Sequence, residues 1–366
     1  MNILLQGQYA RFLEQARDPQ RRSWIIMNPT SIGDTATVCA LAREFVMQHG
    51  YGITMVVPPE HFPITQMFPN RFIRVMTADR PTMLQFLNSF IDSNRFELDM
   101  PFCAHPYDHG DCRTDELMYL FKFPGRGGIS MSDLFRYLLR LPWHACLERP
   151  TIPSEWTMEA EEKAKSVGME RGGSVILFPA NSSPIGQFSD IVWSTLVARL
   201  TARGERVFCN MTGGNFRPTT MPIAGSIPIE IPVHLALPLV SIAGRTISGS
   251  NGMQHLTMLG GRFQQMTVMI PASGIQDDFQ LNLRTCTVTT MLIQYMCPEM
   301  CVDVPFAAYL VPQEAPDEVL MQHAIAVADL ATDGPGYVQR LGSGGGKFVD
   351  EQRGWLKALI QPLSPV

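Results

Sequence analysis

The pattern of apolar and polar positions in the first part of the chain predicts a strand, a helix and a second strand. Residues 23–28 form a short apolar run closed by a proline, which is typical of a buried strand followed by a turn. Apolar residues then recur at the spacing of one helix face, at Val38, Leu41, Ala42, Phe45 and Val46. Gly50 ends this helix and residues 53–57 form the next strand. This order, within about 35 residues, is a βαβ unit with parallel strands.

The same order recurs in the second part of the chain. Residues 174–178 predict a strand, and a helix from Ser189 follows the loop 179–188, with its apolar face at Val192, Trp193, Leu196, Val197 and Leu200. The next strand is 206–211, and a further strand at 245–248 leads through the loop 249–252 into a helix and a strand at 266–270. The pattern therefore predicts an α/β protein made of two halves, each with a parallel sheet.

Proline and glycine clusters predict where these halves divide. Residues 149–154 contain two prolines, so we place a first domain at 1–153 and a second at 154–332. Residues 333–346 hold six glycines and one proline, and helical spacing resumes at Trp355, Leu356, Leu359 and Ile360. We expect residues 333–366 to be a glycine-rich strap and a C-terminal helix that returns to the first domain.

Composition narrows the class of protein. The chain has 366 residues, 45% of them hydrophobic and 17% charged, as in a globular protein. Its net charge is −5 without any run of five like charges, which argues against nucleic acid as a partner. No apolar stretch reaches about 18 residues and the N-terminus lacks a signal-peptide pattern, so a cytoplasmic location is expected. Peripheral contact with a membrane stays open.

Several familiar motifs fail at a position that their chemistry requires. The Gly346–Lys347 pair lacks both the opening glycine and the hydroxyl residue of a phosphate-binding P-loop. No GxGxxG follows a predicted strand, and neither GxSxG nor HExxH occurs. The eight cysteines contain no CxxC pair, which favours reduced thiols over a disulfide scaffold or a zinc site.

Loops after the predicted strands are the remaining candidate sites, because open α/β sheets bind ligands at the carboxyl ends of their strands. One loop places Gly33 and Asp34 at the start of a helix, where Asp34 is either an N-cap or a functional carboxylate. Two others are rich in small hydrogen-bonding residues: Asn181, Ser182 and Ser183 in the first, and Ser250, Asn251, Gly252 and His255 in the second. These are typical of anion-binding loops and of ordinary turns alike.

A polar segment in the first half has potential metal ligands but no fixed ligand spacing. It runs from His105 to Arg113 and includes Asp108 and His109. Its proline and glycine content predicts a loop, which we interpret as solvated or facing a substrate rather than as a metal site.

Three of these segments together resemble the heptosyltransferase-like glycosyltransferases, glycosyltransferase family 9. Residues 31–34 followed by a helix resemble that family's first loop, residues 175–178 with the following loop and Trp193 resemble its central nucleotide loop, and residues 248–256 (SGSNGMQHL) resemble its donor-binding segment. The resemblance implies a GT-B fold, in which two Rossmann-like domains with parallel sheets face each other across a cleft. It also implies a place in bacterial glycan biosynthesis.

By this resemblance the protein transfers a sugar from a nucleotide-diphosphate donor to an acceptor hydroxyl on a glycan, lipid or protein. Asp34 is then the general base. The expected donor-binding residues are Gly33, Asn181, Ser182, Ser183, Thr212, Gly213, Gly214, Ser250, Asn251, Gly252 and His255, and the expected acceptor-side residues are His105, Asp108, His109 and Arg113.

The chain departs from the family's pattern at two points of the donor site. Ser250–Asn251 stands where the family tends to have Asp-Ser, and Gln187 stands where a phosphate-contacting lysine is often found. No DxD-like acidic pair follows an early strand, so we expect transfer without a metal and without a cofactor other than the sugar nucleotide as co-substrate. Two alternatives remain: a non-catalytic protein that binds a nucleotide sugar or a protein, and a sugar-nucleotide epimerase.

Overall fold

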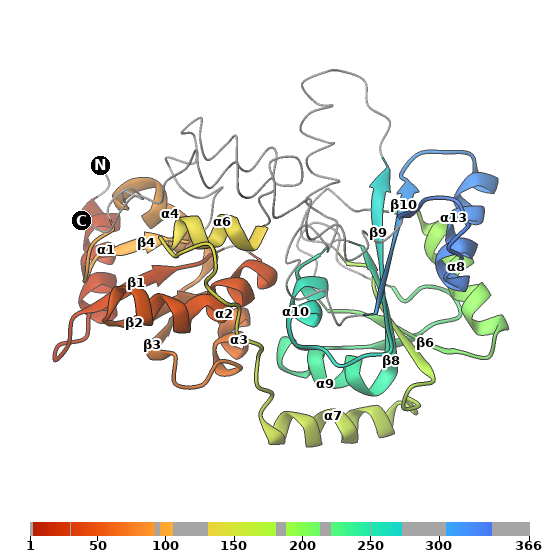
Figure 1. Ribbon diagram of the computed structural model, residues 1–366, viewed down its shortest axis with the longest axis horizontal. Coiled ribbons are helices and arrows are strands. Elements are labelled where there is room, and N and C mark those ends of the chain that lie inside the picture. The colour runs from red at the N-terminus through yellow and green to blue at the C-terminus, as the bar shows by residue number, and fades with distance from the viewer. Residues whose placement is uncertain are drawn as a thin grey trace. The chain divides into compact units, whose positions relative to one another are not determined.

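The structure is a computed structural model that describes residues 3–29, 31–91, 96–104, 131–180, 188–212, 221–249, 251–272 and 305–338. These residues form two compact units that divide between Thr151 and Ile152. Each unit is built on its own sheet (Figure 1). Most of the predicted strap and the whole of the predicted C-terminal helix, residues 339–366, lie outside the described residues.

The first unit is a four-stranded parallel sheet covered by helices. Its elements are α1 (Ile3–Ala16), β1 (Ser23–Met27), α2 (Ile32–His49), β2 (Gly52–Val57), η1 (Pro59–His61), α3 (Phe62–Gln66), β3 (Phe72–Thr77), α4 (Arg80–Phe90), β4 (Pro101–Cys103) and α6 (Met131–Leu138). The strand order is β3-β2-β1-β4, with Met27 paired to Cys103. The predicted βαβ unit is confirmed, and Gly50 ends α2 with a positive φ of 80°.

The core of the first unit lies on both faces of its central strand. Phe12 and Ala16 of α1 and Phe86 of α4 pack with Ile25 and Met27 on one face. On the other, Trp24, Phe45 and Phe102 form an aromatic cluster with edge-to-face contacts, joined by His49 and Phe96. Because β1 is buried over its whole length, its apolar run needs no alternation of polar residues.

The second unit is a seven-stranded sheet with the doubly wound order. Its elements are α7 (Ser154–Ser166), β5 (Ser174–Phe178), α8 (Asp190–Ala202), β6 (Arg206–Asn210), β7 (Ile227–Ile229), α9 (Val233–Ala243), β8 (Gly244–Gly249), α10 (Gly252–Gly260), β9 (Gln265–Ala272), β10 (Phe306–Pro312), α13 (Asp317–Asp329) and β11 (Tyr337–Val338). Read from β7, the order β7-β6-β5-β8-β9-β10 is the 3-2-1-4-5-6 arrangement of dinucleotide-binding folds. These six strands are parallel as predicted, and β11 is an added antiparallel edge strand.

Two helices cover one face of this sheet side by side (Figure 1). Val192, Leu196 and Leu200 of α8 and Leu320 and Val327 of α13 pack over the apolar side chains of the central strands. The apolar face predicted for the helix after Ser189 is therefore the buried face. On the remaining side α9 contacts β5 and β8 and packs against α7 and α10.

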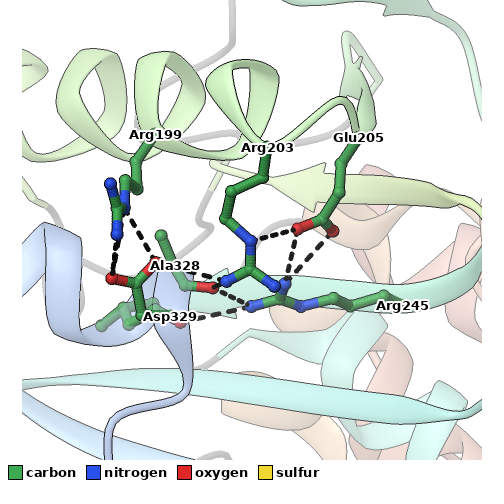
Figure 2. A network of polar contacts seen from close by, with 7 residues as sticks. Arg199, Arg203, Glu205, Arg245, Ala328 and Asp329 are labelled. Carbon is green, nitrogen blue, oxygen red and sulfur yellow. Dashed lines mark hydrogen bonds and ion pairs between the residues drawn. The ribbon is translucent and has the colours of Figure 1, made fainter.

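A network of charged side chains ties the same two helices to the sheet at the amino ends of its strands (Figure 2). Arg199 and Arg203 bind Asp329 at the end of α13, with N–O distances of 2.7 and 3.2 Å. Glu205 accepts from Arg203 and from Arg245 of β8, at 3.3 and 3.2 Å. The amino ends of the strands are opposite to the carboxyl ends, where a ligand would bind, so the network has a structural role.

No helix among the described residues is long and apolar enough to cross a membrane. Of the four cysteines that the structure describes, Cys39, Cys103 and Cys209 are buried thiols and Cys146 is exposed, and none of the four is in a disulfide. Burial raises the pKa of the Cys39 thiol well above its ordinary value.

Candidate functional site

The candidate residues that the structure describes lie at the carboxyl ends of strands in both sheets. In the first unit the loop after β1 enters α2, and the chain after β4 begins beside it, because Ala104 donates its N–H to the Met27 carbonyl at 3.2 Å. Strand order reverses between β1 and β4, so this point is where an open α/β sheet leaves a crevice. The acceptor-side residues His105, Asp108, His109 and Arg113 follow β4 but lie outside the described residues.

Asp34 is held in a capping box at the start of α2. Ser31 is the N-cap residue, and its hydroxyl donates to Asp34 Oδ2 at 2.7 Å while the Asp34 N–H donates back to Ser31 Oγ at 3.3 Å. The structure thus corrects the simpler interpretation of Asp34 as the N-cap, because Asp34 occupies the third helical position. Its side chain is oriented by Ser31 and the residue is 8% exposed. Gly33, in the same turn, is buried.

A buried histidine that sequence reasoning missed lies next to this turn. His61 of η1, after β2, places Nδ1 2.9 Å from Thr35 Oγ1, and that hydroxyl is 3.4 Å from Asn28 Oδ1. Burial, and to a smaller extent Arg80, lowers the pKa of His61 to about 4, although Glu60 and Asp34 act in the opposite direction. His61 is therefore neutral at pH 7. The only sequence signal was its place shortly after a strand and the Pro58–Pro59 pair.

The depressed pKa of His61 predicts a loss of stability in acid. Between about pH 6.5 and 4 the unfolded chain binds a proton at this residue and the folded chain does not, so the free energy of unfolding falls by up to about 3 kcal/mol as pH decreases. We expect His61→Gln to abolish this part of the pH dependence. Urea unfolding at pH 7.5 and pH 5 measures it, with the exposed His144→Gln as the matched control. Equal pH dependence in wild type and His61→Gln would contradict the assignment.

In the second unit three predicted donor-site residues lie together in the first turn of α10. Asn251 is the N-cap, and its Oδ1 accepts from the Gln254 N–H at 3.0 Å. Gly252 is the first residue of the helix and His255 the fourth, and both are partly exposed. The sequence-based expectation that this segment is a loop entering a helix is confirmed.

The end of β6 is fastened by a side chain that the sequence did not single out. Asn210 is buried, and its Oδ1 accepts from the N–H groups of Thr212 and Ile231 at 3.2 and 3.1 Å. The Thr212 hydroxyl lies 2.8 Å from both Asn210 Oδ1 and the Ile231 carbonyl. Because its hydroxyl proton and its N–H both serve these internal acceptors, Thr212 can offer a ligand only acceptor lone pairs.

These residues lie at the carboxyl ends of neighbouring strands of the second sheet. β8, β5 and β6 are neighbours, and Phe178 at the end of β5 pairs with Ser248 near the end of β8. The start of α10 and Thr212 therefore lie on the same side of three adjacent strands. The other predicted donor residues, Asn181, Ser182, Ser183, Gly213, Gly214 and Ser250, and also Gln187, lie outside the described residues.

The part of the chain that the structure describes contains no set of side chains that could form a metal centre. No cluster of three or more His, Cys, Asp or Glu side chains occurs there. The residues at the two sheet edges are instead amides, hydroxyls, glycines and single ionisable groups, which suit hydrogen bonding to an anion or a sugar.

Comparison with known proteins supports this architecture. No protein-family model matches the chain, and no curated protein does. Among solved structures, E. coli ADP-heptose LPS heptosyltransferase II matches with a TM-score of 0.51 at 11% identity, over 84% of this chain and 99% of that chain. This chain has the GT-B fold.

Two further glycosyltransferase structures match less closely. A family 9 glycosyltransferase from Veillonella parvula has a TM-score of 0.45 at 11% identity, over 68% of this chain and 80% of that chain. E. coli heptosyltransferase WaaC with ADP has the same TM-score at 12% identity, over 85% of this chain and 99% of that chain. The match to heptosyltransferase II, with its TM-score of 0.51, confirms the GT-B fold expected from the sequence resemblance, while the residue roles that the resemblance implies stay predictions.

Proposed function

We propose that the protein is a glycosyltransferase that moves a sugar from a nucleotide-diphosphate donor to an acceptor hydroxyl. The observation that carries the proposal is the start of α10, which lies beside the end of β5, where the 3-2-1-4-5-6 order of the second sheet reverses. Ligands of doubly wound sheets bind at this point. The GT-B fold supports the proposal further, because it occurs in glycosyltransferases whose donors carry a nucleotide diphosphate.

The donor diphosphate is assigned to the first turn of α10 and the loop after β5. Helix N-terminal N–H groups and the helix dipole favour an anion there. Gly252 has no side chain to keep a phosphate away from this backbone, and His255 is a candidate hydrogen-bond donor to a phosphate oxygen. In the proposed site Ser182, Ser183 and Ser250 complete this surface, with residues 212–214 near the base or ribose.

The acceptor is assigned to the edge of the first sheet, with Asp34 as the base. In the proposed reaction the acceptor oxygen bonds to the anomeric carbon of the donor sugar as the bond from that carbon to the diphosphate oxygen breaks. The hydroxyl proton passes to the Asp34 carboxylate, and the diphosphate leaves with the electron pair. Ser31 orients the carboxylate through its 2.7 Å hydrogen bond.

The proposed transfer uses no cofactor and no metal, and its acceptor is a glycan, lipid or protein. Its support is the absence from the sequence of an acidic pair after an early strand, because such a pair holds the divalent ion of metal-dependent transferases. Gln187 stands where a phosphate-contacting lysine is often found. In the proposed site helix N-termini and neutral hydrogen-bond donors therefore stabilise the charge of the departing diphosphate.

Binding of nucleotide diphosphates tests the donor assignment. We expect calorimetry with ADP, UDP and GDP to show binding, and His255→Ala to weaken it about 10-fold, the value of one lost hydrogen bond to a charged group. His144→Ala, which changes an exposed histidine of the first unit, is the control and should bind as wild type does. No binding of any of the three nucleotides at millimolar concentration would contradict the proposal.

Turnover separates the proposed activity from its alternatives. We expect the nucleotide diphosphate to be released from a sugar nucleotide only when an acceptor is present. Binding without release would favour a non-catalytic nucleotide-sugar protein, and a changed donor sugar in the absence of acceptor would favour an epimerase. Either result would contradict the assignment as a transferase.

A further inference from the structure

The side chain of Asn251 joins two segments that are far apart in the sequence. Its Nδ2 donates to the carbonyl oxygens of Phe178 and Ala180, each at 3.2 Å, across more than seventy positions of the chain. Its Oδ1 simultaneously accepts the Gln254 N–H at 3.0 Å. One carboxamide therefore caps α10 and binds the chain as it leaves β5.

These contacts lie at the switch point of the second sheet. β5 and β8 are adjacent, and the strand order reverses between them. The chain continues from β5 to α8 and from β8 to α10. Both loops belong to the proposed donor site. The parallel pairing of β5 and β8 stops at Phe178 and Ser248, so the Asn251 contacts with Phe178 and Ala180 extend the link between the two strand ends.

The use of the amide changes what Asn251 can do for a ligand. A carboxamide nitrogen has two protons, and here two carbonyl oxygens accept from it. What remains on the side chain is acceptor capacity at Oδ1, which does not suit an anionic phosphate. Asn251 was expected to contact the donor, and its observed contacts favour a different role.

We infer that Asn251 is a positioning residue, whose carboxamide holds residues 178–180 at the end of β5 against the first turn of α10 so that both meet the donor diphosphate as one preformed surface. This inference rests on the proposed function. A preformed surface binds more tightly because less ordering accompanies binding. Loss of the carboxamide protons should therefore weaken donor binding even when the helix stays capped.

The chemistry of the N-cap position provides a clean set of variants. Serine and aspartate cap helices about as well as asparagine does, since each offers a side-chain oxygen to the first turn. Serine has one proton and a shorter reach, and aspartate has none at neutral pH and would place a negative charge beside two carbonyl oxygens. Asn251→Ser and Asn251→Asp thus keep the cap and remove the link to β5.

A control exists in the first unit. Asp79 is the N-cap of α4 and its side chain accepts from the Thr82 N–H at 2.9 Å, as Asn251 does from Gln254. No contact of Asp79 with a distant strand end accompanies this bond among the interactions that the structure describes. Asp79→Ser therefore changes a cap alone.

The experiment combines hydrogen exchange of the full chain with calorimetry using the nucleotide diphosphate that wild type binds best. We expect Asn251→Ser to speed amide exchange in peptides that cover the end of β5, residues 176–180, and to weaken nucleotide binding about 10-fold. Asn251→Asp should weaken it further, and in the transfer assay both should raise the donor KM more than they lower kcat. Asp79→Ser should leave exchange at 176–180 and the Kd unchanged.

Wild-type exchange at residues 176–180 and a wild-type Kd in Asn251→Ser would overturn the inference, since capping alone would then account for Asn251. The exchange measurement needs no ligand, so it tests the link even if no nucleotide diphosphate binds. Absence of binding in wild type would remove the proposed function, whereas unchanged exchange in Asn251→Ser would remove this inference.

Discussion

Replacing Asp34 with asparagine is expected to slow sugar transfer by about 10²–10⁴-fold, the range for loss of a general base. Asparagine has nearly the same shape as aspartate, and its Oδ1 can still accept from the Ser31 hydroxyl that binds Asp34 Oδ2 at 2.7 Å. The capping box therefore survives in part. What disappears is the carboxylate that would take the proton from the acceptor hydroxyl.

Stability separates this role from a purely structural one. Loss of a negative charge in the first turn of a helix costs about 0.3–1 kcal/mol, so the free energy of unfolding should change little in Asp34→Asn. Asp79→Asn is the matched control, because it removes the same charge at the start of α4. We expect the control to keep wild-type transfer. Near-normal transfer in Asp34→Asn would show that the base lies elsewhere, and the ionisable residues Asp108, His109 and Asp111 of the polar segment 105–113 would be tested next.

Replacing Arg245 with methionine is expected to lower the free energy of unfolding by about 2–4 kcal/mol. The Arg245 side chain is 10% exposed and binds Glu205 at 3.2 Å and the Ala328 carbonyl at 2.8 Å (Figure 2). Burial lowers the pKa of Arg245, and Glu205 is the principal group that raises it again. Methionine fills the same space but leaves Glu205 with Arg203 alone and removes the Arg245 donor from the Val327 and Ala328 carbonyls, of which Ala328 keeps its bond from Arg203.

The comparison variants separate the charge from the packing. Arg171→Met removes an exposed pair with Glu161 and should change the free energy of unfolding by no more than about 0.5 kcal/mol. Combining Arg245→Met with Glu205→Gln should recover part of the loss, because a neutral amide then replaces the carboxylate that keeps only Arg203. Urea unfolding measures all three. An Arg245→Met protein as stable as Arg171→Met would contradict a stabilising role of the network.

The site could be predicted from the sequence only where its chemistry is local. The start of α2 and the start of α10 followed from short patterns, because a helix cap involves residues three positions apart. The same patterns did not distinguish Asp34 as N-cap from Asp34 as the partner of Ser31. They also did not show that the Asn251 amide binds Phe178 and Ala180, because nothing near Asn251 in the sequence indicates those carbonyls.

His61 and Asn210 illustrate why other parts of the site were missed. Each is a polar residue beside a strand end, and the sequence around it has no motif. Burial lowers the pKa of His61, whose ring lies against Thr35. The buried Asn210 side chain accepts hydrogen bonds from Thr212 and Ile231. Burial depends on which helices cover the sheet, which periodicity alone does not indicate.

The sequence by itself determined the βαβ units, their parallel strands, the starts of α2 and α10 and the resemblance to GT-B glycosyltransferases. These follow from spacing along the chain, since side-chain period and helix capping act over a few residues. Only the tertiary structure decided the strand order 3-2-1-4-5-6, the added edge strand β11 and the contacts of Asn251 and Arg245. Those depend on contacts between residues as much as 83 positions apart, and such contacts form only when the sheet and its helices pack together.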